Sequence, residues 1–456
     1  MSEPLYADFA LSGDGAAPVV VTPQQPAPDV AVAGPEVAPI LARALAGQEI
    51  GVEEGTRLFE ASGPELLPLV AVADHLRRQA VGDRVTYVVN RNINFTNVCV
   101  KRCGFCAFSR GHRAGEGYFL PVEEVLRRAR EAVELGATEV CMQAGLAPGL
   151  DGWYYVKLVR AVKEALPELH IHGCSPEEVL YGSELAGASV EDYLRALQDA
   201  GLGSLPGTSA EILDDSVRDV ISPGRINTEQ WVHLVQTAHR LGIPTTSTMM
   251  YGHVETARHK AEHLALLRRI QQETGGITEF VPLGFIFEEA PMFAKRRPPG
   301  LREGPSGIET MKMYAIARIM LHGWIPNVQV SWVKEGQKLA QVGLMAGAND
   351  LGGTLINESI STAAGAQHGQ LVKPAVFRRL AREMGREPAE RATDYRILRS
   401  FADPAQDPQD ALEQVTDPQG RFGSYQDLVA EQRFRFRDFF AEQQAAAVIP
   451  AIPGRR

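Results

Sequence analysis

The feature that most restricts the fold is an alternation of short strand-like segments with helical segments between residues 84 and about 370. The candidate strands are rich in β-branched residues and are followed by loop and helix signals. Eight strands that alternate with helices are typical of an α/β fold of the TIM-type (β/α) barrel kind, and an open doubly wound sheet is the second choice. The predicted strands are residues 84–95, 138–143, 169–174, 202–205, 244–250, 278–287, 327–332 and 350–355.

Helical patterns fill the intervals between these strands. The first opens with Pro121 and closes before Gly136, which matches the preference for proline in the first turn of a helix and glycine after the last. In a barrel of this kind the active site lies at the carboxyl ends of the strands. The other predicted helices are residues 153–166, 190–199, 231–241 and 257–273.

The chain of 456 residues divides into four stretches of different composition. Residues 1–35 contain no Lys or Arg and many Pro, Ala and Val, so we predict a disordered tail with few side chains that can pack. Residues 36–83 have a helical pattern and form the N-terminal helices. The barrel is predicted over residues 84–375, and a polar, helical and charged C-terminal extension over residues 376–456.

The charge balance excludes some classes of partner. The net charge is −10, from 46 basic and 56 acidic residues, which is unfavourable for a nucleic-acid or anionic-membrane surface. No segment reaches the roughly 18 continuous apolar residues of a membrane helix. The N-terminus has neither the basic nor the apolar region of a secretory signal, so we expect a cytoplasmic protein with reduced thiols.

Three of the five cysteines fall within eight residues, directly after the first predicted strand. Cys99, Cys103 and Cys106 have the spacing C-x3-C-x2-C, which places three thiolates on one tight loop and favours a soft metal centre. A 4Fe–4S cluster bound by three thiolates leaves one iron open to a substrate, whereas clusters for electron storage usually have four cysteine ligands. We predict these three residues as the metal ligands.

Two other interpretations of the cysteine loop stay open at this point. One is a zinc site with His112 as the fourth ligand, although structural zinc sites usually space their ligands as two separated pairs. The other is an iron–sulfur electron carrier with no substrate turnover. Cys141 and Cys174 lie in predicted strands and are expected to pack as small apolar residues.

The cysteine loop, with Phe105 before its last cysteine, resembles that of the radical S-adenosylmethionine superfamily. The resemblance implies that S-adenosylmethionine chelates the open iron, and that its cleavage yields a 5′-deoxyadenosyl radical. It also implies that the loop after the second strand, Gln143-Ala144-Gly145, contacts the amino group of S-adenosylmethionine. Small residues in such a loop let the backbone approach a ligand closely.

Polar residues after the fourth strand are further candidates for contacts with this cofactor. Thr208, Ser209 and Glu211 lie at a predicted strand-to-helix turn, where they either bond ribose hydroxyls or cap the following helix. Arg225 is either a surface residue or a partner for the carboxylate of S-adenosylmethionine, since arginine suits bidentate recognition of carboxylates.

After the fifth strand, Met250 and Tyr251 offer a polarisable surface for adenine. His253 and Glu255 follow them at the predicted barrel mouth, and we predict a catalytic role for both. The remaining polar candidates for the substrate pocket are Asn349, Asp350 and His368.

Several longer motifs, taken in order, resemble the CofH family of deazaflavin synthase subunits and together span about residues 80–395. The chain differs from the family at Gly173-Cys174, where Ala-Phe is usual, and at residues 117–121, but neither position is in the cysteine loop. The matching motifs are residues 92–109, 201–215 (GLGSLPGTSAEILDD), 248–256 (TMMYGHVET), 280–285 (FVPLGF), 348–355 (ANDLGGTL) and 363–370 (AAGAQHGQ).

This resemblance implies a transferase of deazaflavin (7,8-didemethyl-8-hydroxy-5-deazariboflavin) biosynthesis. In that family the radical takes a hydrogen from L-tyrosine, the Cα–Cβ bond breaks, and the 4-hydroxybenzyl fragment bonds to 5-amino-6-(D-ribitylamino)uracil. A CofG-type partner then closes the deazaflavin ring, and a reducing electron donor is required. The alternative is a radical enzyme of the futalosine route to menaquinone, which shares the cysteine loop and a variant of YGHVE.

Overall fold

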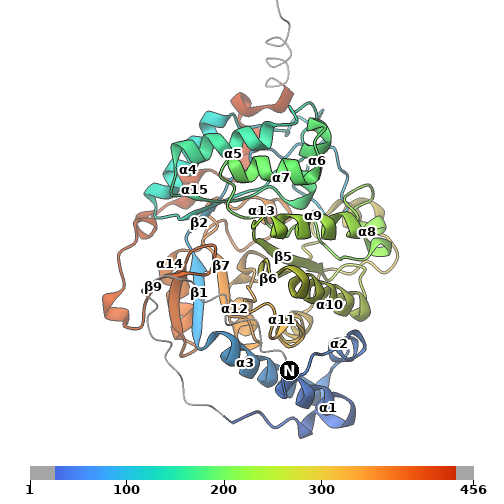
Figure 1. Ribbon diagram of the computed structural model, residues 1–456. Helices are drawn as coiled ribbons and strands as arrows, with labels where there is room; N and C mark the ends of the chain where they lie inside the picture. Colours follow the sequence, from blue (N-terminus) through green and yellow to red (C-terminus); the bar gives the residue numbers. More distant parts are fainter. Residues whose placement is uncertain (1–25, 438–456) are drawn as a thin grey trace, which may run out of the picture.

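The computed structural model describes residues 26–437. Its central feature is a set of parallel strands that run through the middle of the molecule (Figure 1). The strands are β1 (Arg84–Val88), β2 (Asn90–Asn92), β3 (Glu139–Met142), β4 (His170–Gly173), β5 (Thr245–Tyr251), β6 (Ile277–Gly284) and β7 (Asp350–Gly353).

Parallel pairings connect these strands into a closed ring. β2 pairs with β3, β3 with β4, β5 with β6, and β1 with β7. Residues 204–205 bridge β4 to β5, and residues 328–329 bridge β6 to β7. The predicted TIM-type barrel is therefore confirmed.

Three of the predicted strands differ from what forms. The first, over residues 84–95, is divided into β1 and β2. Those over residues 202–205 and 327–332 are reduced to isolated bridges, because Pro206 ends the one and a helix begins at Trp332 in the other.

Helices follow the strands as the sequence predicts. The five predicted helices form within three residues of their predicted limits, although Pro121 is the N-cap rather than the first helical residue. The helices of the barrel are α4 (Val122–Glu134), α5 (Tyr154–Ala165), α6 (Pro176–Ala186), α7 (Val190–Asp199), α8 (Asp215–Ile221), α9 (Thr228–Arg240), α10 (Ala257–Thr274), α11 (Gly307–Leu321), α12 (Trp332–Met345), α13 (Ile360–Ala363) and α14 (Pro374–Arg382). Among the described helices, none is both long and apolar enough to cross a membrane.

The N-terminal helices form a layer at one end of the barrel (blue in Figure 1). They are α1 (Gly34–Leu45), α2 (Val52–Phe59) and α3 (Leu66–Val81), and they pack against α10 and α11. Of the predicted disordered tail, residues 1–25 lie outside the described residues. Its predicted end at residue 35 is wrong, because a 3-10 turn begins at Ala31 and buries Ala33.

The C-terminal extension is part of the barrel. It contains β8 (Glu387–Arg391), which pairs in parallel with β1, and β9 (Ile397–Ser400), which pairs with β8 in antiparallel orientation. The prediction of a helical extension is therefore wrong for residues 387–400, which form strands. The chain then continues through α15 (Pro418–Phe422) and α16 (Tyr425–Ala430) to the side of the molecule that carries α4 (Figure 1).

Alternate residues of each strand face a cavity of about 370 Å³ inside the ring. Parallel strands buried on both faces are usually apolar throughout, yet many of these inward positions are polar. They include Asn90, Asn92, Glu139, His172, Thr246, Thr248, Glu279, Gln329 and Ser331. The interior of the barrel is therefore suited to a polar ligand.

Candidate active site

The cysteine loop lies at the carboxyl end of β2 and is fixed by backbone hydrogen bonds. The N–H of Cys99 donates to the carbonyl of Arg110 (3.0 Å), and the N–H of Gly104 donates to the carbonyl of Ile221 (2.7 Å). Cys99, Cys103 and Cys106 all line the cavity, and all three are free thiols. The loop therefore presents three soft ligands to one cavity.

The arrangement of these thiols bears on the kind of metal centre. Within residues 26–437, no three His, Cys, Asp or Glu side chains gather where a single metal ion fits. The alternative of a mononuclear zinc site with His112 is therefore not preformed. An iron–sulfur cluster bonds each cysteine to a different iron, so its ligands need not converge on one point.

Burial opposes ionisation of the thiols in the protein alone. It raises the pKa of Cys103 to about 12, although the positive charge of Arg225 acts in the opposite direction. Burial also raises the pKa of Cys99. Because metal ligation requires the thiolate, a positively charged metal centre supplies the stabilisation that the buried loop lacks.

The loop after β3 is hydrogen-bonded to the segment that carries the cysteines. The N–H of Gly145 donates to the carbonyl of Thr96 (2.9 Å), and the N–H of Val100 donates to the carbonyl of Leu146 (2.9 Å). A Cβ on Gly145 would lie 2.3 Å from the carbonyl oxygen of Val98, so only glycine fits there. The predicted small-residue loop thus has a steric role beside any contact with a cofactor.

We expect Gly145→Ala to destabilise the protein by about 1–3 kcal/mol, because the clash is with backbone that cannot rotate away. It should also lower the amount of cluster that reconstitutes, since the displaced backbone belongs to the cysteine loop. Urea unfolding and iron content measure the two effects. Gly111→Ala is the matched control, because a Cβ there meets no atom within 4 Å. Equal behaviour of the two variants would contradict the prediction.

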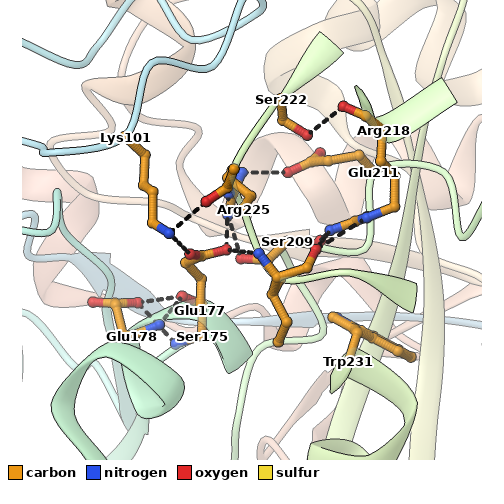
Figure 2. A network of polar contacts seen from close by, with 12 residues as sticks. Lys101, Ser175, Glu177, Glu178, Ser209, Glu211, Arg218, Ser222, Arg225 and Trp231 are labelled. Carbon is orange, nitrogen blue, oxygen red and sulfur yellow. Dashed lines mark hydrogen bonds and ion pairs between the residues drawn. The ribbon is translucent and has the colours of Figure 1, made fainter. Parts of the chain in front are cut away.

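A network of charged groups lies beside the cysteine loop, and Figure 2 shows it centred on Arg225. The Arg225 guanidinium donates to Glu177 (3.1 Å), Glu211 (3.0 Å) and the Ser209 hydroxyl (2.6 Å). Lys101, from the cysteine loop, pairs with Glu177 at 3.2 Å. Residues from three separate segments are thereby joined at one wall of the cavity.

The turn that carries two of these groups is strained. Ser209 and Glu211 have φ values of 65° and 46°, in the left-handed region that non-glycine residues rarely adopt. Residues in such conformations cost of order 1–3 kcal/mol each and cluster at functional sites. Arg218 holds the turn by donating to the carbonyls of Ser209 and Ala210. Thr208 donates to Gln143 at 2.7 Å, which links this turn to the loop after β3.

The floor of the cavity is formed by the C-terminal extension. Arg391 of β8 forms an ion pair with Asp350, the first residue of β7, at 2.6 Å. Thr393 donates to Glu139 at 2.7 Å, and Tyr395 donates to Glu279. Arg391 and Thr393 line the cavity together with Glu139 and Glu279. The cavity thus runs from the cysteine loop to this buried cluster of charges.

Comparison with known proteins agrees with this site. Residues 93–267 match the model of the radical SAM superfamily, and residues 274–403 match that of the CofH/MqnC C-terminal region. The chain is 50% identical to the 5-amino-6-(D-ribitylamino)uracil–L-tyrosine 4-hydroxyphenyl transferase of Methanothermobacter thermautotrophicus, over 79% of this chain and 97% of that protein. The chain belongs to this transferase family of the radical SAM superfamily.

Two further similarities are consistent with that membership. The chain is 48% identical to FO synthase of Mycobacterium tuberculosis over 78% of its own length and 41% of that protein. The crystal structure of methylornithine synthase aligns with a TM-score of 0.57 at 20% identity, covering 77% of this chain and 97% of that one. The second similarity concerns the fold alone and agrees with the barrel described above.

The histidine and carboxylate predicted as catalytic lie outside this transferase cavity. His253 and Glu255 are buried, and neither lines this cavity or the second cavity described below. Glu255 accepts from the N–H groups of Gly252 and His253 (both 2.8 Å) and pairs with Arg302. These contacts stabilise the turn after β5. A catalytic role for the pair stays a prediction.

Some of the other predicted residues line the cavity, and others are buried in the surrounding core. Gln143, Ala144, Gly145, Thr208, Ser209, Glu211 and Arg225 line the cavity. Met250 and Tyr251 are buried in β5 and do not line it, and the Tyr251 hydroxyl donates to Thr310 (3.2 Å). Cys174 packs in the core as predicted, whereas Cys141 faces the cavity.

The sequence motifs give no sign of two glutamates, Glu177 and Glu178, that line the cavity. Ser175 caps α6, and Glu178 accepts from the N–H of Ser175 (2.8 Å) and from the N–H of Ala144 (3.0 Å). Burial raises the pKa of Glu178 to about 7. Glu177 joins Lys101 to Arg225. The signal that points to both is their position directly after β4, at the carboxyl end of a barrel strand.

Proposed function

We propose that this chain transfers the 4-hydroxybenzyl group of L-tyrosine to 5-amino-6-(D-ribitylamino)uracil in deazaflavin biosynthesis. The observation that supports the proposal is one cavity lined by three cysteines and many polar side chains. It lies in a chain that is 50% identical to a 5-amino-6-(D-ribitylamino)uracil–L-tyrosine 4-hydroxyphenyl transferase and matches 97% of that transferase's length. Two polar substrates and a cofactor require a cavity lined in this way, because a carbon radical must be kept from water.

The cofactor assignments follow from which residues line the cavity. Cys99, Cys103 and Cys106 would hold a 4Fe–4S cluster, and S-adenosylmethionine would lie between them and the Gln143–Gly145 loop. Together these groups supply a 5′-deoxyadenosyl radical when bound. The residues proposed to bind the ribose are Thr208, Ser209 and Glu211, on the strained turn.

Arg225 needs a more specific assignment. Its guanidinium already donates to Glu177, Glu211 and Ser209, so pairing with the carboxylate of S-adenosylmethionine requires it to give up one of these partners. We propose that its main role is to position Ser209 and Glu211 toward the ribose.

Two partners are part of the proposal. The chain carries one cysteine loop of the C-x3-C-x2-C type, and its matched region spans only 41% of FO synthase. We therefore propose that a CofG-type partner completes the deazaflavin ring. A reducing electron donor is also needed, since reductive cleavage of S-adenosylmethionine consumes an electron.

The test is a product assay after anaerobic reconstitution with iron and sulfide. The enzyme is incubated with S-adenosylmethionine, a reductant, L-tyrosine and the diaminouracil. We expect 5′-deoxyadenosine together with the coupled adduct, identified by mass spectrometry. Omission of tyrosine is the control and should remove the adduct.

Other outcomes would overturn the proposal in different ways. A bound cluster that never yields 5′-deoxyadenosine would indicate an electron carrier. Turnover of 3-[(1-carboxyvinyl)oxy]benzoate or a futalosine, with no adduct from tyrosine, would indicate the menaquinone route.

A further inference from the structure

Four cationic side chains line the cavity inside the ring, and they differ in whether they form an ion pair with a carboxylate. Lys101 pairs with Glu177, Arg225 with Glu177 and Glu211, and Arg391 with Asp350. The ammonium of the fourth, Lys334, forms neither a hydrogen bond nor an ion pair with any residue in the described part of the chain. Lys334 is therefore the cation that is free to meet a ligand.

The position of Lys334 is unusual. A second cavity of about 440 Å³ lies beside the first, lined by the loop after β6, the start of α12 and residues 365–368. Lys334 is the one residue, among those described, that lines both cavities. It lies in the first turn of α12, two residues before Gly336, whose φ of 71° interrupts the helix. Lys334 therefore lies between the two spaces.

The surroundings of Lys334 act on its charge in two directions. Burial lowers its pKa, and the negative charges of Glu358, Glu335 and Glu211 act in the opposite direction. The Lys334 side chain is half-buried and its ammonium has no partner among the described residues, and in native proteins such groups often have a ligand as their partner. A bound carboxylate would satisfy the ammonium.

We propose that Lys334 binds the α-carboxylate of the amino-acid substrate. The proposal deepens the proposed function and rests on it, because an amino-acid substrate supplies a carboxylate that the cavity must recognise. The cationic groups beside the cysteine loop, Lys101 and Arg225, are already in ion pairs. Lys334 follows a different segment of the ring, residues 328–329, and adjoins the second cavity.

The test compares L-tyrosine with tyramine, which lacks only the carboxylate. In reconstituted enzyme with S-adenosylmethionine bound, Lys334→Met should raise the Kd for tyrosine about 10- to 100-fold, the range expected for a hydrogen-bonded charge. The Kd for tyramine should stay the same, because tyramine has no carboxylate to lose. Lys334→Arg should restore part of the preference for tyrosine. Lys338→Met, an exposed lysine of the same helix, is the matched control.

The variants also need a check of their integrity. Lys334→Met should keep the wild-type cluster content and affinity for S-adenosylmethionine, since the ammonium is assigned to the substrate alone. If Lys334→Met does not fold, Lys334→Arg still tests the inference, because it keeps the positive charge. A folded Lys334→Arg protein that binds tyramine normally but no longer prefers tyrosine would contradict the inference.

Two results would overturn the inference alone. One is an unchanged tyrosine-to-tyramine ratio in Lys334→Met, and the other is a loss of S-adenosylmethionine affinity in place of tyrosine affinity. By contrast, an unmodified enzyme that cleaves S-adenosylmethionine but neither binds nor consumes tyrosine would overturn the proposed function, and the inference with it.

Discussion

Replacing Cys103 by alanine is expected to remove both the iron–sulfur cluster and the cleavage of S-adenosylmethionine. Cys103 lines the cavity and is one of three thiols on the loop, so the variant leaves two ligands for a cluster that needs three. After anaerobic reconstitution, iron should fall from about four atoms per chain to background. Formation of 5′-deoxyadenosine should fall to background as well. Iron and sulfide content and chromatography of the products measure these effects.

The five cysteines supply their own controls for this experiment. Cys141→Ala changes a thiol that lines the same cavity from β3, and Cys174→Ala changes a thiol in the core. Both should keep the cluster. The folding of apo Cys103→Ala should resemble that of the apo wild type, because the thiol forms no disulfide and its removal leaves only a small cavity. A Cys103→Ala protein with full iron content and turnover would contradict the ligand assignment.

Site residues that lie close together in the sequence, on a short segment after a strand, could be predicted from the sequence. The cysteines, the loop at residues 143–145 and the turn at residues 208–211 each follow a strand, and the barrel rule places all such segments at one end. The three cysteines of the loop, residues 143–145, Thr208, Ser209 and Glu211 line the cavity. Local spacing and strand periodicity indicate where these segments lie, and the resemblance to the radical S-adenosylmethionine superfamily adds what residues 143–145 would contact.

Residues whose role depends on distant contacts could not be found in this way. Arg391 reaches Asp350 only because β8 pairs with β1, and no pattern in the predicted helical extension indicates that pairing. Lys334 is one lysine among many until the two cavities are known. A distinctive motif can also hide a structural role: His253 and Glu255 have hydrogen bonds within their own turn, and Glu255 pairs with Arg302, while their predicted catalytic role stays a prediction.

Replacing Arg391 by methionine is expected to lower the stability of the protein by about 3–5 kcal/mol, the usual cost of breaking a buried ion pair by removing one partner. The side chains of Arg391 and Asp350 are 3% and 0% exposed, and Arg391 also lies 3.7 Å from Glu279. The variant leaves two carboxylates buried without their cation. Urea unfolding of the apo protein measures the loss.

The loss should depend on pH in a defined direction. Burial already raises the pKa of Glu279 to about 7, although Arg391 opposes the rise. Without Arg391, the folded-state pKa of the Glu279 carboxyl rises further above its unfolded value. Such a group costs nothing below its unfolded pKa and destabilises increasingly as the pH rises toward its folded pKa. Arg391→Met should therefore be much closer to wild type at about pH 5 than at about pH 8.

Two further variants separate the ion pair from other effects of the substitution. Arg396→Met removes an exposed arginine 3.9 Å from Asp394 and should change the stability by less than about 0.5 kcal/mol. Arg391→Met combined with Asp350→Asn should recover part of the loss, because the second change removes one of the unpaired charges. A loss that is independent of pH and not recovered in the double variant would mean that Arg391 acts by packing against Tyr395, whose ring centre lies 4.0 Å from its guanidinium. In that case the C-terminal extension closes the barrel by shape rather than by charge.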